Sequence, residues 1–573
     1  MVVAAPQVQN RLTIQVEAVA ADTTVIRSLD WDRDRFDIEF GLQNGTTYNS
    51  FIIRGEKTAL VDTSHGKFRQ LYLETLKGQI DPTEIDYIVI SHTEPDHSGL
   101  VRDVLELAPQ ATIVGAKVAL AFLDDLVHRP FERLQVKNGD TLDLGNGHVL
   151  EFLNAPNLHW PDTIFTYDHQ SQVLFTCDAF GLHYCSDAVY DEDLAAISPD
   201  FRFYYECLMA PNARSVLSAM KRMDALPEIK TVATGHGPLL RHNVVELTGR
   251  YRRWSQEKSQ SETLVAVFYM SDYGYSDRIS QAIAHGITKT NVTVEMMDLR
   301  SADPQEVNEL VGRAKGLVIG MIPATGAKVA QAALGTILAA VKDKQTVGLF
   351  ESYGGDDDPI DPLLTRFQDL ELRIAFDPIR IKDTPNEGVY QLCEEAGTDL
   401  GQLLGQAKKM KKLKSLNAEL EKALGRISSG LYIITAKKGE VTSAMLASWV
   451  SQASFQPLGF TVAVAKDRAI ESLMQVGDSF VLNILEEGNY AALMKHFLKR
   501  FPPGGDRFAG IRTRPAQNGS PLLADALAYL ECTVTSRMEV SDHWIVYCTV
   551  QEGKVSNPDR LTAVHHRKVG TYY

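Results

Sequence analysis

Short apolar runs in the first part of the chain end in side chains that commonly bind metals. The run YIVI at residues 87–90 is followed directly by SHTEPDHSG, which contributes four of them: His92, Glu94, Asp96 and His97. Three more come after other apolar runs: His159 after VLEFLNAP, Asp178 after VLF and His236 after TVA. Such runs are typical of buried strands, and polar groups beyond the ends of neighbouring strands gather at one edge of a sheet. The pattern predicts an α/β domain over residues 1–258 with its site at the strand ends.

The order of these seven residues indicates a metal site. One of them alone is explained by the ordinary polarity of a strand end. All seven, in the order HxExDH, His, Asp, His, are better explained by a two-metal centre, because a motif gains weight from its structural context.

The same order resembles the metallo-β-lactamase fold, an αββα sandwich with two metals at its edge. Hydrolases of that fold carry HxHxDH, whereas Glu94 here replaces the second histidine. A carboxylate makes the site harder and more anionic, which suits iron better than zinc. Glu94 is the hallmark of flavodiiron proteins, and the sequence resembles that family. The resemblance implies one iron on His92, Glu94 and His159, a second on Asp96, His97 and His236, and Asp178 as the bridge between them.

Residues 259–405 alternate between strand and helix patterns. LVAVFY (264–269), VTVEMM, GLVIGM and TVGLF read as strands, with helices expected at 277–289 and 327–344. This βαβ pattern predicts a doubly wound parallel sheet.

The loops of this segment resemble those of flavodoxin, which binds FMN. The first loop offers hydroxyls and a helix N-terminus that favour a phosphate, and it lacks GxGxxG. The implied FMN contacts are Ser271, Tyr273, Ser276, Pro323, Ala324, Ser352, Tyr353, Gly354 and Gly355. The run Asp356–Asp358 either lowers the reduction potential of the flavin or points into solvent. A flavodoxin-like fold without flavin is the alternative.

Residues 406–424 form a Lys-rich connector, and the pattern after it changes to strands. The connector has two possible roles: a basic surface that binds NADPH or another anionic partner, and a solvated linker helix. We favour the linker helix. Residues 425–573 hold β-rich runs separated by turns, which predicts a barrel. They resemble the split β-barrel of flavin reductases. The resemblance implies that residues 496–508 of this chain border the nicotinamide. The implied contacts to FMN or FAD are Ser443, Met445, Ala447, Ser448, Trp449, Ser454 and Asn483, with Lys466 near a phosphate.

The order of the three domains resembles the flavodiiron subclass found in oxygenic phototrophs. The resemblance implies an NAD(P)H:oxygen oxidoreductase that makes water, with electrons passing from NAD(P)H to the C-terminal flavin, then to FMN, then to the diiron centre. It also implies a head-to-tail homodimer or a heteromer with a related chain. Three alternatives stay open: nitric oxide reduction at the same centre, a zinc hydrolase fused to flavin domains, and a non-catalytic or electron-transfer subunit that works only in a heteromer.

The net charge, the apolar runs and the cysteines of the sequence argue against several other classes of protein. A net charge of −15 argues against nucleic-acid binding, which needs a basic surface. No apolar run approaches 18 residues and the N-terminal residues lack a signal-peptide pattern, so we expect no membrane span and a cytoplasmic location. The six cysteines form no CxxC pair and are interpreted as scattered reduced thiols.

Overall fold

The computed structural model describes residues 11–36, 40–259, 263–270, 275–300, 302, 304–321, 327–352, 360–413 and 418–567. These residues divide into two compact units. The first lies within Met1–Gln281, Thr293–Ala314 and Thr325–Val341, and the second within Ala282–Val292, Lys315–Ala324 and Lys342–Tyr573. None of the helices among the described residues has the length and apolar character needed to cross a membrane.

Two sheets form the centre of the N-terminal domain. In spatial order, the first contains β1 (Leu12–Ala20), β2 (Thr23–Asp30), β5 (Thr46–Arg54), β6 (Thr58–Val61), β7 (Ile85–Val89), β8 (Thr112–Gly115) and β9 (Glu132–Gln135). The second contains β10 (Thr141–Gly145), β11 (His148–Asn154), β12 (Ile164–Asp168), β13 (Val173–Cys177) and β14 (Thr231–Thr234). A short hairpin pairs β3 (Arg35–Phe36) with β4 (Phe40–Gly41).

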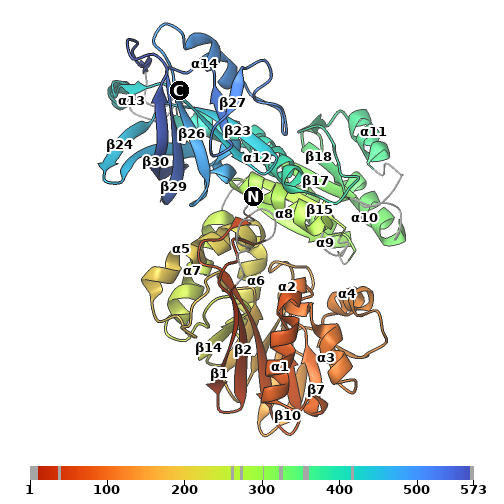
Figure 1. The fold of residues 1–573 in the computed structure, drawn as a ribbon. Coiled ribbons are helices and arrows are strands. Elements are labelled where there is room, and N and C mark those ends of the chain that lie inside the picture. The colour runs from red at the N-terminus through yellow and green to blue at the C-terminus, as the bar shows by residue number, and fades with distance from the viewer. Residues whose placement is uncertain are drawn as a thin grey trace. The chain divides into compact units, whose positions relative to one another are not determined.

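Helices cover the outer face of each sheet. The first group is α1 (Arg69–Gln79), α3 (Val101–Leu107) and α4 (Lys117–Val127), and the short helix α2 (Pro95–Ser98) comes between β7 and α3 in the chain. The second group is α5 (Leu194–Tyr204), α6 (Ala213–Met223) and α7 (Val244–Ser259). Figure 1 shows α1, α3 and α4 on one side of the strands and α5, α6 and α7 on the other.

Three apolar clusters account for this layering. Strands of both sheets share one cluster, which includes Phe51, Phe152 and Phe175 and fills the space between the sheets. The two other clusters lie between a sheet and its helices, one around Leu76 and one around Tyr251. Burial on both sides explains why the strands read as continuous apolar runs. The predicted αββα sandwich is confirmed.

A parallel sheet follows, as the flavodoxin resemblance implies. Its strands, in spatial order, are β16 (Thr293–Asp298), β15 (Leu264–Tyr269), β17 (Gly316–Met321), β18 (Thr346–Glu351) and β19 (Arg373–Ile374), and β20 (Ile379–Arg380) also pairs with β18. Its helices are α8 (Tyr275–Thr288), α9 (Pro304–Arg313), α10 (Ala327–Ala340), α11 (Asp361–Asp369) and α12 (Glu387–Leu413). The two helices expected at 277–289 and 327–344 correspond to α8 and α10.

Helix α12 continues across the domain boundary that the sequence analysis placed at residue 405. A separate helix, α13 (Ala418–Leu424), follows it, so the Lys-rich connector consists of the end of one helix and a second short one.

The C-terminal strands form an antiparallel sheet, as expected for a barrel. In spatial order they are β23 (Val441–Ala447), β22 (Tyr432–Lys438), β26 (Ser479–Ile484), β29 (Ala528–Val540), β30 (His543–Val555), β25 (Leu458–Ala465) and β24 (Val450–Phe455). Two small sheets pair β21 (Ser429–Gly430) with β31 (Val564–His565) and β27 (Thr513–Pro515) with β28 (Pro521–Leu523), and α14 is Ala491–Phe497. Phe460, Phe480 and Val546 lie in the apolar cluster inside the curved sheet.

Candidate metal centre

The seven predicted metal ligands come together at the strand ends of the N-terminal domain. His92 follows β7, and Glu94 immediately precedes α2, which carries Asp96 and His97. The other three ligands lie in the β11–β12 loop, after β13 and after β14: His159, Asp178 and His236. The parallel pairing of β13 with β14 places the last two side by side. All seven side chains are buried, with at most 7% of any residue exposed.

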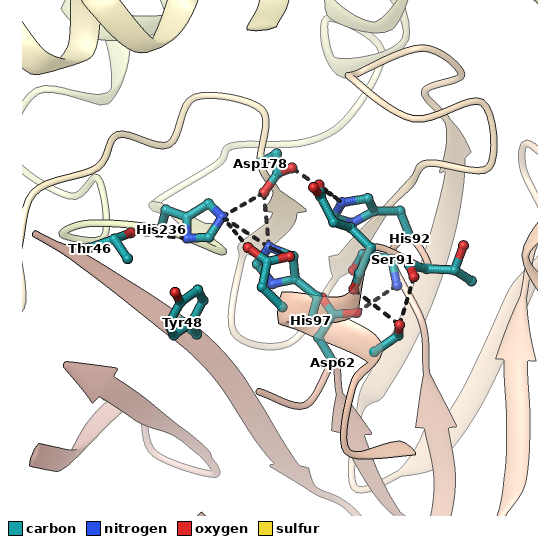
Figure 2. Close-up of polar contacts among 12 residues, drawn as sticks. Thr46, Tyr48, Asp62, Ser91, His92, His97, Asp178 and His236 are labelled. Atoms are coloured by element: carbon teal, nitrogen blue, oxygen red, sulfur yellow. Dashed lines mark hydrogen bonds and ion pairs between the residues drawn. The ribbon is translucent and has the colours of Figure 1, made fainter. Parts of the chain in front are cut away.

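Asp178 lies between the imidazole of His92 on one side and those of His97 and His236 on the other (Figure 2). Its Oδ2 is 3.2 Å from His92 Nε2 and 3.0 Å from His159 Nε2. Its Oδ1 is 3.0 Å from His97 Nε2 and 3.3 Å from His236 Nε2. Each oxygen therefore faces one pair of imidazoles, which is the arrangement needed for a carboxylate that bridges two metal ions.

The other two carboxylates each join one set. Glu94 Oε2 is 2.8 Å from His159 Nε2 and 3.3 Å from His92 Nε2. Asp96 Oδ2 is 3.3 Å from His236 Nε2, and its Oδ1 is 3.6 Å from His97 Nε2. We call His92, Glu94 and His159 the first set, and Asp96, His97 and His236 the second set. Each set supplies two imidazole nitrogens and one carboxylate, with Asp178 shared between them.

The carboxylates control the protonation of the imidazoles. Burial alone would lower the pKa of His159, but the charges of Glu94 and Asp178 raise it to about 10. Burial opposes the shift of His236 in the same way, and its bonds to Asp178 and Asp96 raise its pKa to about 10. Protons on these rings balance the buried carboxylates wherever metal cations do not. The ligand atoms of the first set and Asp178 lie within 4.8 Å of one another, as do those of the second set. The donor set fits two divalent metal ions.

Buried groups behind the ligands fix their orientation. His236 Nδ1 is 2.6 Å from the carbonyl oxygen of Thr47, so the Nε2 atom is directed toward the carboxylates. His159 Nδ1 is 3.1 Å from the side-chain amide of Gln281. Acceptors of the second ring N–H, such as the Thr47 carbonyl, orient metal-binding histidines and tune their basicity.

The sequence analysis missed several neighbours of the centre. Cys177, interpreted as a scattered thiol, lies with its sulfur beside His92 and Asp178, and burial first of all raises the pKa of its thiol well above the usual value. Asp62 accepts a hydrogen bond of 2.8 Å from the backbone N–H of Ser91. Asp62 directly follows the apolar strand β6, and Cys177 is the last residue of β13. The search for metal-binding side chains at the ends of apolar runs could therefore have identified both residues. The Thr47 carbonyl has no sequence signal.

Only part of the implied FMN site lies within the described residues. Ser276, in the first turn of α8, and Ser352, after β18, are both buried. The other predicted contacts, Ser271, Tyr273, Pro323, Ala324, Tyr353, Gly354 and Gly355, and the run Asp356–Asp358, lie outside the residues that the structure describes.

The predicted flavin contacts of the barrel fall into two groups. The first contains Ser443 and Ser448, which are buried and whose hydroxyl oxygens have no hydrogen-bond partner in the described part of the chain. Buried polar atoms are normally paired, so these two hydroxyls fit a site that a bound ligand completes. Met445 is half-buried near them on β23, and Trp449 is 37% exposed.

The second group already has protein partners. The Ser454 hydroxyl bonds to the Pro457 carbonyl oxygen at 2.6 Å and to Tyr547 Oη at 2.7 Å. The side chain of Asn483 bonds to the Ile433 carbonyl oxygen, to Thr435 and to the Leu523 N–H, so it links neighbouring strands. Lys466 forms an ion pair with Glu539. These three residues have structural roles in the barrel, and flavin contact by them stays a prediction.

Comparisons with known proteins agree with this combination of domains. Residues 46–237 match the family described as ODP family beta lactamase, and residues 424–572 match the family described as flavin reductase like domain. Putative diflavin flavoprotein A 3 from Nostoc sp. (strain PCC 7120) is 68% identical over 100% of both chains. Diflavin flavoprotein A 1 from Synechocystis sp. (strain PCC 6803) is 69% identical over 99% of both chains.

A solved structure matches about two thirds of the chain. The metal-soaked flavodiiron core from Synechocystis sp. PCC6803 is 37% identical and has a TM-score of 0.65, covering 69% of this chain and 99% of that chain. Because relatives at this level of identity match along the whole length, the chain belongs to the diflavin flavoproteins, a flavodiiron family of oxidoreductases that use flavins and iron.

Proposed function

We propose that this protein reduces O₂ to water with electrons from NAD(P)H, at a diiron centre held by the seven buried side chains. The observation that carries the proposal is the position of Asp178, whose two oxygens each face a pair of imidazoles. Two ferrous ions held by these residues would supply two electrons for the reduction of O₂.

The protein side chains provide charge balance and shielding. Three carboxylates offset the positive charge of two divalent ions, and burial separates the centre from bulk water. Glu94 in place of a histidine makes the first set more anionic, which favours iron and argues against a zinc hydrolase.

Reduction of O₂ to water takes four electrons, so the chain needs a further electron source. We propose FMN in the flavodoxin-like domain and FMN or FAD in the C-terminal barrel. A flavin bound in the barrel would supply the chemistry that takes a hydride from NAD(P)H and releases its electrons one at a time. Ser443 and Ser448 support a ligand site in the barrel because their buried hydroxyls lack partners among the described residues.

A head-to-tail homodimer or a heteromer with a related chain, and a cytoplasmic location, belong to the same proposal.

Oxygen uptake tests the function directly. Full-length, iron-loaded protein is supplied with NADPH and then NADH, and O₂ and hydrogen peroxide are recorded in one cell. The proposal predicts O₂ uptake with little peroxide. Stoichiometric peroxide would show that only flavin autoxidation occurs, and so contradict it. Anaerobic turnover of NO that exceeds the turnover of O₂ would instead favour nitric oxide reduction at the same centre.

A further inference from the structure

Asp162 lies between the two segments that carry the first set of ligands. It belongs to the β11–β12 loop, three residues after His159, and only 1% of the residue is exposed. Its Oδ2 accepts two hydrogen bonds from Thr93, one from the backbone N–H at 2.9 Å and one from Oγ1 at 2.6 Å. Thr93 is the residue between His92 and Glu94. One carboxylate oxygen therefore ties the loop of one ligand to the segment of the other two.

The second set is held by different groups. The backbone carbonyl oxygen of His97 accepts a hydrogen bond of 2.7 Å from the N–H of Thr63, and His236 Nδ1 meets the Thr47 carbonyl oxygen at 2.6 Å. The hydrogen-bond partner of Asp162, Thr93, lies directly between two ligands of the first set and three residues before Asp96 of the second set. Loss of its carboxylate should therefore affect the two sets unequally.

The burial of Asp162 indicates a specific role. A buried carboxylate is costly unless its bonds compensate for the loss of water. Burial first of all raises the pKa of this carboxyl group, although the Thr93 bonds and the charge of His92 oppose that shift. Both Thr93 bonds end on Oδ2, so the oxygen of an asparagine amide could accept them equally well.

We propose that Asp162 is a positioning residue that fixes Thr93 and thereby sets the geometry and metal affinity of the first set, while the second set is independent of it. This inference rests on the proposed diiron centre. Residues that orient metal ligands typically change metal affinity by about 10–100-fold when they are removed.

Metal titration of the full-length apoprotein tests the inference without relying on turnover. Co(II) is added anaerobically, the ions bound per chain are counted, and the visible d–d absorption of each step is recorded. Wild-type protein should bind two ions. In Asp162→Ala one ion should bind as in the wild type, and the other should bind about 10–100-fold more weakly. Asp162→Asn should restore most of that affinity, because it keeps the acceptor oxygen.

Two further variants separate this role from general damage to the fold. Thr93→Val keeps the backbone N–H but removes the hydroxyl donor, so it should weaken the same single step by a smaller factor. Asp168→Ala is the matched control. Asp168 is also fully buried and accepts a hydrogen bond from His148 Nδ1 at 2.8 Å, but it is the last residue of β12. Its loss should leave both Co(II) steps unchanged.

The outcomes distinguish the two levels of the proposal. A wild-type chain that binds fewer than two Co(II) ions overturns the diiron centre itself. Two tight steps in Asp162→Ala overturn only the role of Asp162, as does equal weakening of both steps. An Asp162→Asn variant as weak as Asp162→Ala would also contradict the positioning role.

Discussion

Two buried clusters of ionisable groups in this protein differ in how their charges balance. The metal centre of the N-terminal domain contains three carboxylates and four imidazoles. In the second unit, Lys289, Glu394, Glu471 and Arg537 form what we call the four-charge cluster. Lys289 Nζ lies 2.6 Å from Glu471 Oε2 and also contacts Glu394, and Arg537 contacts Glu471. The side chains of all four are at most 10% exposed.

The four-charge cluster is complete in itself. It joins two cations to two anions, so no imported ion is needed. Burial alone would raise the pKa of Glu471, but Lys289 and Arg537 outweigh it and lower the pKa below the usual range. The metal centre has no lysine or arginine among its seven residues, so its three carboxylates are balanced only by cations that the centre takes up, either protons on the imidazoles or metal ions. The comparison shows why burial and proximity alone do not identify a metal site: the absence of a permanent cation among the clustered groups does.

Loss of the bridging carboxylate should have the largest effect. In Asp178→Ala we expect water formation with NAD(P)H to fall by at least ~100-fold, since both metal sets lose their shared ligand. Reduction of the flavins by NAD(P)H should persist because it occurs before electrons reach the centre. Stopped-flow flavin absorbance and oxygen uptake measure the two steps. Water-forming turnover close to that of the wild type would contradict the assignment of Asp178.

Breaking the four-charge cluster should destabilise the protein without affecting metal binding. Lys289→Met leaves Glu394 and Glu471 buried with fewer cations, and removal of one partner from a buried ion pair costs about 3–5 kcal/mol. Urea unfolding of the second unit measures this loss. Lys422→Met is the control, since the exposed pair of Lys422 with Glu419 should contribute little. An unchanged unfolding midpoint in Lys289→Met would show that the cluster does not hold the unit together.

The pH dependence of stability should reveal the same cluster. Because the pKa of Glu471 is lower in the folded protein than in the unfolded chain, its contribution is fully present above the unfolded value of about 4.3. That contribution is lost as the pH falls below about 4.3, where the unfolded chain takes up a proton more readily. The stability difference between wild type and Glu471→Gln should therefore shrink on acidification. A difference that stays constant from pH 7 to pH 3.5 would contradict this linkage.

The smallest effect is expected at Cys177. The seven ligands already form two sets with a shared bridge, so the thiol is not required for binding. Cys177→Ala should keep two metal ions per chain and lose about 1 kcal/mol of stability from the small cavity. Metal analysis that finds one ion lost would make Cys177 a ligand and would require a different division of the centre.

The sequence predicted which residues cluster in the candidate metal centre more completely than it predicted any other part of the chain. All seven residues follow apolar strands of the two sheets, and the parallel pairing of β13 with β14 places Asp178 and His236 side by side. The four-charge cluster could not be predicted in this way. Its residues come from the end of α8, from α12, from the segment after β25 and from β29, and no local spacing links them. Asp162 was missed for a related reason: it lies beside a ligand in the sequence, but its partner Thr93 is 69 positions away.

The predicted flavin contacts of the barrel show that resemblance to a family does not identify the role of each matching residue. Ser443, Ser448 and Asn483 were assigned the same role from one pattern, yet Asn483 bonds three groups of the barrel itself, whereas the two serine hydroxyls have no partner among the described residues. Strand periodicity identifies which residues face inward. It does not indicate which of them hold neighbouring strands together.

The metal content of the protein tests the central claim most directly. Full-length protein expressed with both iron and zinc available is purified without chelators, and both metals are counted per chain. A centre of three carboxylates without a lysine or arginine partner, and with Glu94 in the first set, predicts about two iron ions per chain and little zinc. A chain that carries mainly zinc, or no metal at all, would contradict the account.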